Sequence, residues 1–341
     1  MAELPTSYTA IEHALDQANV VKAMLGLKPV TKKLRNPEPD ELLLKMEAAS
    51  INPSDIAFLQ GNYQIKKNLP TVPGFEGSGR IVATGHLLDA KKWLGKRVSC
   101  FTQQDKDGSW AEYFYAKPSE VLLIDERLDS AQATTFFVNP FTAWGLCEIA
   151  LLRESKTIVV NAAGSRLASF LYQLASMHQI EVIGVVRKQS TVEQLKELGW
   201  KYVLNENDTD FVNQLKTLAL QLHANTAFDA VGGPASGILL NAMPADSENV
   251  IYGGLSNKHL ADIDPLGMIF DNKMITGFNL IDWMAEADSI TLETAQKTIT
   301  EIMLSGKIKT WIQADFPLAE IKTALKTYLG NMSAGKVILT F

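Results

Sequence analysis

The sequence predicts an α/β protein of two domains, one an irregular β-barrel and the other a doubly wound parallel sheet of six strands. Three observations carry this prediction. The chain has 341 residues, more than one ordinary hydrophobic core accommodates. Short apolar or alternating segments separated by Gly, Pro and Asn fill the N-terminal third. Further along, short apolar strands alternate regularly with helical segments, which is typical of a sheet covered on both faces.

The N-terminal third contains extended segments at residues 42–52, 77–85, 96–101 and 108–124. The tail, residues 335–341, also has the pattern of a strand. Residues 131–152 form a long apolar pattern that predicts one helix interrupted at Pro140.

The remainder predicts a regular succession of strands and helices. A helix over 190–199 is expected to start with a capping box of Ser190 and Glu193 and to stop at Gly199. The strands are expected at 156–163, 181–187, 201–206, 227–233, 249–255 and 274–283. We place the β-domain at residues 1–126 and 286–341 and the parallel-sheet domain at 127–285.

Amino-acid composition indicates which binding partners and which cellular compartment to expect. The net charge of −6 and the pI of about 5.5 argue against nucleic acid or an anionic membrane as a partner. No secretory signal pattern and no apolar run of membrane-spanning length is visible. The two cysteines, Cys100 and Cys147, are isolated in apolar segments, which predicts buried thiols in a reducing, cytoplasmic compartment.

The turn after the 156–163 strand is a candidate nucleotide loop, because it leads directly into a helix whose first amides can face a pyrophosphate. The usual G-x-G-x-x-G pattern is degraded. Gly164 remains, Arg166 stands at a position that is usually Gly, and Ala168 takes the last glycine position. Arg166 is either a solvated surface residue or a charge partner for the pyrophosphate that offsets the lost glycine amides.

The next strand ends in Arg187 and Lys188, where NAD-specific sites carry an acidic residue for the ribose hydroxyls. A guanidinium matches a 2′-phosphate bidentately and cannot accept from hydroxyls. The pair therefore predicts NADPH over NADH. The alternative is two solvated cations at a strand end.

Several separated segments together resemble one family. They are INPSDIAFLQGNY at 51–63, VNPFTAW at 138–144, VNAAGSRLA at 160–168, VVRKQ at 185–189, IYGGLSN at 251–257, GFNLIDW at 277–283 and SAGKVILTF at 333–341. The chain is similar over almost its whole length to the zinc-free quinone and 2-enoyl thioester reductases of the medium-chain dehydrogenase/reductase superfamily. That resemblance implies a GroES-like catalytic domain, a Rossmann domain, and a homodimer formed through the 274–283 edge strand.

The resemblance also implies the site. Tyr63 matches the family's catalytic tyrosine, the alternative being an ordinary loop tyrosine. Asn279 stands where the family usually has an aromatic residue. The residues that would contact NADPH are Asn139, Gly164, Ser165, Arg166, Leu167, Arg187, Lys188, Tyr252, Gly253, Gly254, Leu255, Phe278, Leu280 and Lys336.

Metal chemistry is disfavoured by two positions. Zinc alcohol dehydrogenases carry Cys near Pro53–Ser54 and His at Phe75, and this sequence has neither. Glu76 survives, and we expect it to accept hydrogen bonds from turn amides rather than to bind zinc.

The predicted reaction is zinc-independent transfer of a hydride from NADPH to a C=C bond conjugated to a carbonyl. The substrate is a small molecule, namely a quinone, an enone or a 2-enoyl thioester. A crystallin- or sensor-like protein that binds NADPH with little turnover is the alternative, and a zinc-type alcohol dehydrogenase is disfavoured.

Overall fold

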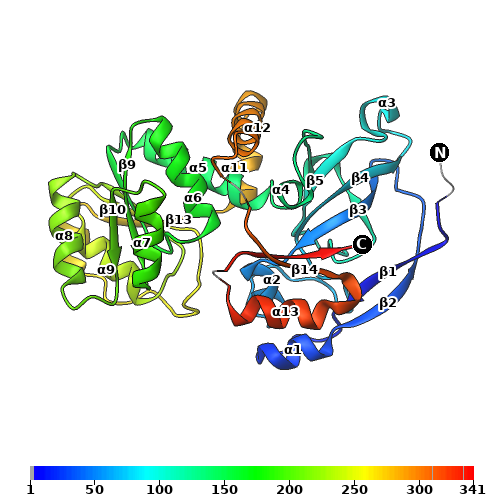
Figure 1. Ribbon diagram of the computed structural model, residues 1–341, viewed down its shortest axis with the longest axis horizontal. Helices are drawn as coiled ribbons and strands as arrows, with labels where there is room; N and C mark the ends of the chain where they lie inside the picture. The colour runs from blue at the N-terminus through cyan, green and yellow to red at the C-terminus, as the bar shows by residue number, and fades with distance from the viewer. Residues whose placement is uncertain (1–3, 309, 333) are drawn as a thin grey trace. The chain divides into compact units, whose positions relative to one another are not determined.

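The structure is a computed structural model that describes residues 4–308, 310–332 and 334–341. The chain divides into two compact units, which we call the first unit (Met1–Val138 and Lys297–Phe341) and the second unit (Asn139–Gln296) (Figure 1). The division falls within helices α5 (Val138–Leu152) and α12 (Ser289–Leu304). The domain limits given above, at residues 126 and 285, stay a prediction.

The first unit is built on a seven-stranded sheet with the path β14-β15-β3-β4-β5-β7, and β6 also pairs with β3. Every segment predicted as extended in the N-terminal third contributes to it. The tail strand β15 pairs antiparallel with β3, so the end of the chain returns to the first unit as predicted. The strands are β3 (Leu42–Ser50), β4 (Glu76–Thr84), β5 (Arg97–Phe101), β6 (Tyr113–Ala116), β7 (Val121–Leu123), β14 (Ile312–Pro317) and β15 (Lys336–Thr340).

Alternation along β3 explains the core of this sheet. Leu42, Leu44 and Met46 lie on one face and pack with Phe114 and the buried Cys100. A separate two-stranded antiparallel sheet joins β1 (Ser7–Glu12) to β2 (Lys28–Lys33). Short helices complete the unit: α1 (Val20–Gly26), α2 (Pro53–Leu59), α3 (Ala90–Trp93), η1 (Pro118–Glu120), α4 (Ser130–Thr134), η2 (Leu318–Glu320) and α13 (Ile321–Gly330).

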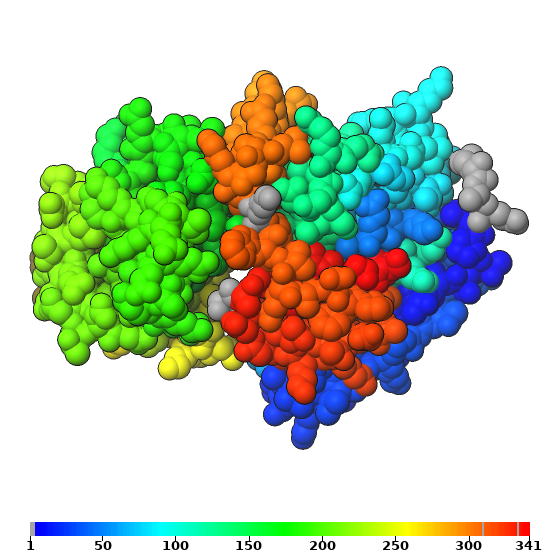
Figure 2. All heavy atoms as spheres, viewed as in Figure 1, coloured from blue at the N-terminus to red at the C-terminus, as the bar shows by residue number. Residues whose placement is uncertain are grey.

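The two ends of the chain meet in the first unit. Helix α13 contacts α1 and packs on β14 and β15. In Figure 2, the orange and red spheres of the C-terminal segment lie directly against the blue spheres of the N-terminal segment. The site residues of this unit therefore come from parts of the chain that are far apart in sequence.

The second unit contains a parallel sheet of six strands in the order β10-β9-β8-β11-β12-β13, which confirms the predicted doubly wound architecture. The strands are β8 (Thr157–Val160), β9 (Glu181–Val186), β10 (Tyr202–Asn205), β11 (Thr226–Asp229), β12 (Glu248–Ile251) and β13 (Met274–Gly277). Besides α5 and α12, the helices are α6 (Arg166–Met177), α7 (Gln189–Glu197), α8 (Phe211–Gln221), α9 (Pro234–Ala242), α10 (Pro265–Phe270) and α11 (Leu280–Glu286).

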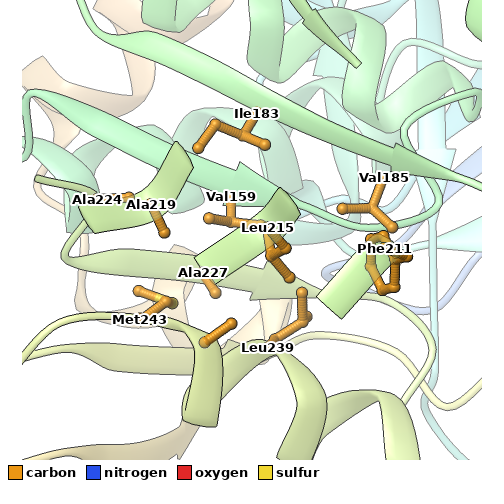
Figure 3. Close-up of a cluster of buried hydrophobic side chains, with 11 residues drawn as sticks. Val159, Ile183, Val185, Phe211, Leu215, Ala219, Ala224, Ala227, Leu239 and Met243 are labelled. Atoms are coloured by element: carbon orange, nitrogen blue, oxygen red, sulfur yellow. The ribbon is translucent and has the colours of Figure 1, made fainter. Parts of the chain in front are cut away.

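Figure 3 shows how one face of this sheet is buried. Helix α8 repeats apolar residues every four positions, at Phe211, Leu215 and Ala219, and this stripe faces Val159 and Val185 of the sheet. Apolar residues at helical spacing in α8 thus pack on the continuous apolar strands and form the core that the sequence pattern indicates.

Two local predictions about helices are wrong, and so is one about the length of a strand. The helix over 131–152 is two helices, α4 and α5, separated at residues 135–137. Pro140 lies in the first turn of α5, where its missing N–H costs nothing. Helix α7 begins at Gln189 with Lys188 as its N-cap, so Ser190 is inside the helix and the capping box does not form. Gly199 does follow that helix, with φ +93°.

The sixth strand is also shorter than predicted. Only Met274–Gly277 is extended, and the residues from Leu280 onward form α11. The reason is Asn279, whose side chain accepts hydrogen bonds from the amides of Ile281 and Asp282 and so starts a helix. Strand β13 lies at the edge of the sheet. No helix within the described residues is long and apolar enough to span a membrane.

Candidate functional site

Tyr63 lies in the turn that follows α2 in the first unit, and its side chain is half-buried. The Gln103 amide nitrogen donates a hydrogen bond to the Tyr63 hydroxyl oxygen at 2.8 Å. The Tyr63 ring lies against Phe75, with 5.6 Å between ring centroids. Burial raises the pKa of Tyr63, the Asp55 carboxylate adds to that effect, and the Gln103 hydrogen bond opposes it. The phenol is therefore protonated at neutral pH and can donate.

Phe75, which directly precedes β4, is almost completely enclosed. Its ring packs edge-on against Phe58. Its amide donates to Asp55 Oδ1 at 3.1 Å, while the Asn52 amide donates to Asp55 Oδ2 at 2.7 Å. Burial raises the pKa of Asp55 to about 7. Asp55 therefore joins the start of α2 to the segment that carries Phe75, with both of its oxygens in use.

Glu76 is fully buried at the start of β4 and accepts three hydrogen bonds. The donors are the Ser50 hydroxyl at 2.8 Å, the Asn52 side-chain amide at 3.0 Å and the Val138 backbone amide at 2.8 Å. Only the last is a backbone amide, and it belongs to the first residue of α5 rather than to a neighbouring turn, so the prediction that turn amides satisfy Glu76 is wrong. These bonds fix the Glu76 carboxylate by contacts within the protein.

Lys336 joins this cluster from the other end of the chain. Its ammonium donates to the side-chain oxygen of Asn52. Cys100 is fully enclosed by the β-sheet core, and burial raises the pKa of its thiol. The part of the chain that the structure describes has no group of three or more His, Cys, Asp or Glu side chains that could hold a metal ion.

The nucleotide loop of the second unit runs from the end of β8 to the start of α6. Ser165 is the N-cap of α6 and accepts from the Ala168 amide at 3.2 Å. A Cβ at Gly164 would approach the Thr191 methyl to 2.8 Å, so a larger residue there would force the Thr191 side chain to move. Ala162 has φ +47°, a left-handed conformation that favours glycine, and the sequence pattern gave no indication of it. Leu167, the second residue of α6, is buried.

The cations near this loop form no ion pair with any described residue, although Arg187 interacts electrostatically with the half-buried Glu206. Arg166 is half-buried at the first position of α6, and burial lowers its pKa to about 10. Arg187 and Lys188 are exposed after β9. Across the described residues, none of the three side chains has an ion pair or a hydrogen bond. The structure thus leaves three positive charges at this loop and the adjacent strand end available to an anion.

Asp229 connects the loops at the carboxyl ends of three strands. Its side chain accepts from Asn161, which follows β8, and from the amides of Val231 and Gly232 at 2.8 and 2.9 Å. Its backbone oxygen accepts from the Tyr252 amide at 3.0 Å, after β12. We did not predict this residue. The available signal was an acidic residue at the end of a buried strand, before two glycines.

The Tyr252–Leu255 turn therefore lies beside the Asp229 turn. Gly253 approaches Ala230 so closely that a Cβ would come within 2.7 Å of its carbonyl oxygen. Leu255 is exposed. The Tyr252 hydroxyl is buried without a hydrogen-bond partner among the described residues.

Phe278 lies against α5, the helix whose second residue is Asn139, and Leu280 is the buried first residue of α11. A Cβ at Gly145 would lie 2.6 Å from the Phe278 ring, so glycine makes room for that ring. Glu148 accepts from the indole nitrogens of Trp144 and Trp283, each at 2.8 Å. Neither Gly145 nor Glu148 was predicted, since their roles depend on contacts across more than a hundred residues.

The chain is similar to known reductases throughout. Residues 38–126 match the alcohol dehydrogenase GroES-like domain family, and residues 167–295 match the family described as zinc-binding dehydrogenase. The mitochondrial enoyl-[acyl-carrier-protein] reductase of Arabidopsis thaliana is 27% identical over 350 residues, covering 99% of this chain and 89% of that protein.

Solved structures extend this comparison. A Mesorhizobium loti protein provisionally assigned as an NADPH:quinone reductase is 30% identical, with a TM-score of 0.91, over 99% of this chain and 100% of that one. A mutant form of enoyl thioester reductase from Candida tropicalis shares the fold, with a TM-score of 0.78 at 19% identity over 98% of this chain and 100% of that one.

Proposed function

Because this chain belongs to the quinone and enoyl reductase branch of the medium-chain dehydrogenase/reductase superfamily, we propose that it is an NADPH-dependent reductase of conjugated carbonyl compounds. Its substrate class is a quinone, an enone or a 2-enoyl thioester. The observation that carries the proposal is the half-buried Tyr63 hydroxyl, whose oxygen accepts a hydrogen bond from Gln103 at 2.8 Å.

Conjugate reduction needs a group that stabilises charge on oxygen. NADPH, when bound, supplies a hydride to the β-carbon and leaves as NADP⁺. The electron pair of the C=C bond then moves toward the carbonyl oxygen, and Tyr63 donates its hydroxyl hydrogen to that oxygen. A proton from solvent then bonds to the α-carbon while the oxygen returns its proton to the Tyr63 phenolate, so the carbonyl re-forms and the product gains one hydride and one proton in total. The first unit thus provides the acid, and no step requires a metal.

The charges of the second unit support NADPH as the cofactor. Arg187 and Lys188 are exposed and form no ion pair in the described ranges, although Arg187 interacts electrostatically with Glu206, and both cations suit a 2′-phosphate. Arg166, with Gly164, Ser165 and Leu167 beside it, would face the pyrophosphate. The remaining proposed contacts are Asn139, Tyr252, Gly253, Gly254, Leu255, Phe278, Leu280 and Lys336.

Tyr63→Phe tests the acid. We expect kcat to fall at least about tenfold while the Kd for NADPH stays unchanged, because the phenol acts on the substrate oxygen. NADPH oxidation would be followed by absorbance with 1,4-benzoquinone, an enone and crotonyl-CoA. Tyr115→Phe is the matched control, since it removes a hydroxyl that bonds to the Arg35 backbone in the same unit. Wild-type kcat in Tyr63→Phe would remove Tyr63 from the mechanism.

The same panel separates the alternatives. Tight NADPH binding with no turnover of any substrate would favour a sensor or crystallin role. Loss of activity after EDTA treatment, with recovery on adding zinc, would favour the zinc-type dehydrogenase. We expect full activity after EDTA and no stoichiometric zinc by elemental analysis.

We also propose a homodimer formed through the β13 edge. The edge strand is half-buried to exposed, and α10 exposes Leu266, Ile269 and Phe270 in the same unit. A monomer at micromolar concentration in sedimentation velocity would contradict this. The cytoplasmic location and the absence of nucleic-acid or membrane partners stay predictions from composition.

A further inference from the structure

We propose that Gln103 is a positioning residue that fixes the direction in which the Tyr63 hydroxyl donates, an inference that rests on the proposed function. Gln103 lies in the loop after β5, and its side-chain nitrogen is 2.8 Å from the Tyr63 oxygen. The Gln103 side chain is half-buried, as is that of Tyr63. It touches the candidate acid at the atom that would exchange the proton.

The direction of this hydrogen bond decides what Tyr63 can do. A phenol oxygen that accepts from an amide N–H must turn its own hydrogen elsewhere, which leaves that hydrogen available for a substrate oxygen. When the hydrogen is donated, the phenol oxygen gains negative charge, and the amide bond to it becomes stronger. Gln103 therefore both orients the donor and stabilises the oxygen after donation.

The groups around Tyr63 disfavour negative charge on its oxygen, so the hydrogen bond from Gln103 has a large effect on that charge. Burial and the Asp55 carboxylate both disfavour negative charge on Tyr63, whereas the Gln103 hydrogen bond favours it. Another nearby charge, the buried Lys67 ammonium, faces the Phe75 ring at 5.3 Å and donates to the Lys106 carbonyl oxygen. Gln103 is thus the group that supports the developing phenolate by direct contact.

The loop that carries Gln103 is fastened on both sides. The Thr102 amide donates to the Phe75 carbonyl oxygen at 2.9 Å, and the Thr102 hydroxyl donates to Glu120 at 2.5 Å. Lys106 donates to the other oxygen of Glu120 at 2.5 Å. Because Phe75 also packs on Tyr63, the same segment supports both members of the pair. This rigidity is what a positioning role requires.

The side-chain amide of Gln103 can direct either its nitrogen or its oxygen at Tyr63, and only the nitrogen gives this arrangement. With its oxygen toward Tyr63, Gln103 would accept the phenol hydrogen and withhold it from the substrate. Gln103→Glu imposes that second arrangement, because a carboxylate accepts only. Gln103→Met keeps the length of the side chain and removes both functions. The two variants therefore separate hydrogen-bond direction from side-chain volume.

The experiment measures kcat, the KM for crotonyl-CoA or 1,4-benzoquinone, and the Kd for NADPH in Gln103→Met and Gln103→Glu. Each is made in wild-type and in Tyr63→Phe backgrounds. We expect kcat to fall about threefold to tenfold in Gln103→Met, the value of one hydrogen bond between neutral groups. We expect a larger fall in Gln103→Glu. KM, Kd and the thermal midpoint should not change, and Gln104→Met, an exposed neighbour, is the control.

Three outcomes would overturn the inference. They are a wild-type kcat in Gln103→Met, a Gln103→Glu variant at least as active as Gln103→Met, and an equal loss from Gln103→Met in the Tyr63→Phe background. All three leave the role of Tyr63 intact. Wild-type kcat in Tyr63→Phe alone would instead reject the proposed acid, and with it this inference.

Discussion

The polar site residues of the first unit differ from the cations of the second unit in whether the protein pairs them. In the first unit, Tyr63, Glu76 and Lys336 each have a hydrogen-bond partner from the protein. In the second unit, Arg166, Arg187 and Lys188 have neither an ion pair nor a side-chain hydrogen bond within the described ranges. The same contrast holds for burial, since Glu76 is fully enclosed while Arg187 and Lys188 are exposed.

The difference corresponds to two kinds of task. A group that transfers a proton must be held in one geometry before the substrate arrives, and protein hydrogen bonds provide that geometry. A group that binds a phosphate gains most when no carboxylate competes for it. The pairing of Tyr63 therefore suits a positioned reactive group, and the absence of ion pairs at the three cations of the second unit suits a ligand site. Variants in each unit test this difference.

The largest expected effect concerns the buried hydrogen bonds of the first unit. Glu76→Ala leaves the Ser50 hydroxyl, the Asn52 amide and the Val138 amide without their acceptor in a fully buried site. We expect the free energy of unfolding to fall by about 3 kcal/mol or more, measured with urea. Glu76→Gln should lose less, because it keeps one acceptor oxygen.

Glu126→Ala is the control for Glu76, because that carboxylate pairs with Arg80 while 63% exposed. Exposed pairs contribute about 1 kcal/mol or less. Similar losses in the Glu76 and Glu126 variants would show that the buried cluster is not a rigid element of the first unit.

The next largest effect concerns the cations of the second unit. In the double variant Arg187→Ala with Lys188→Ala, we expect the Kd for NADPH to rise about a hundredfold, or about 1.4 kcal/mol for each lost phosphate contact. The Kd for NADH should stay within about twofold, because it has no 2′-phosphate. Lys196→Ala, an exposed lysine in the last turn of α7, is the control. Equal weakening of both cofactors would contradict the assignment of these residues to the 2′-phosphate.

The sequence predicts the parts of this molecule that depend on local pattern. The six parallel strands follow from short apolar runs, and the return of β15 to the first unit follows from the tail motif. Local prediction fails where a side chain competes with the pattern. Asn279 starts a helix within an apparent strand, and Lys188 rather than Ser190 precedes α7.

The site could be predicted only in part, for a physical reason. Motifs locate Tyr63 and Arg187, because each lies in a recognisable local segment. They cannot locate partners that approach through folding, such as Gln103 beside Tyr63 or Lys336 beside Asn52, 284 residues away in sequence. Such contacts depend on strand pairing and register, which no short segment encodes.

The smallest predicted effect tests Arg166, the residue that departs most from the usual nucleotide loop. A pyrophosphate is common to NADPH and NADH, so Arg166→Ala should raise both Kd values by about fivefold to tenfold. This differs from the Arg187 and Lys188 variant, which should discriminate between the two cofactors. Arg166→Gly restores the usual residue and should lose less affinity than Arg166→Ala, because it lets the backbone approach the phosphate.

Isothermal titration of Arg166→Ala and Arg166→Gly with each cofactor makes this measurement. Glycine at the first position of α6 also loosens the helix by about 1 kcal/mol at most, so thermal melts must accompany the titrations. An unchanged Kd for both cofactors in Arg166→Ala would make Arg166 a solvated residue. The contrast between the units would then rest on Arg187 and Lys188 alone. A loss confined to NADPH would instead move Arg166 to the 2′-phosphate, because only that group distinguishes the two cofactors.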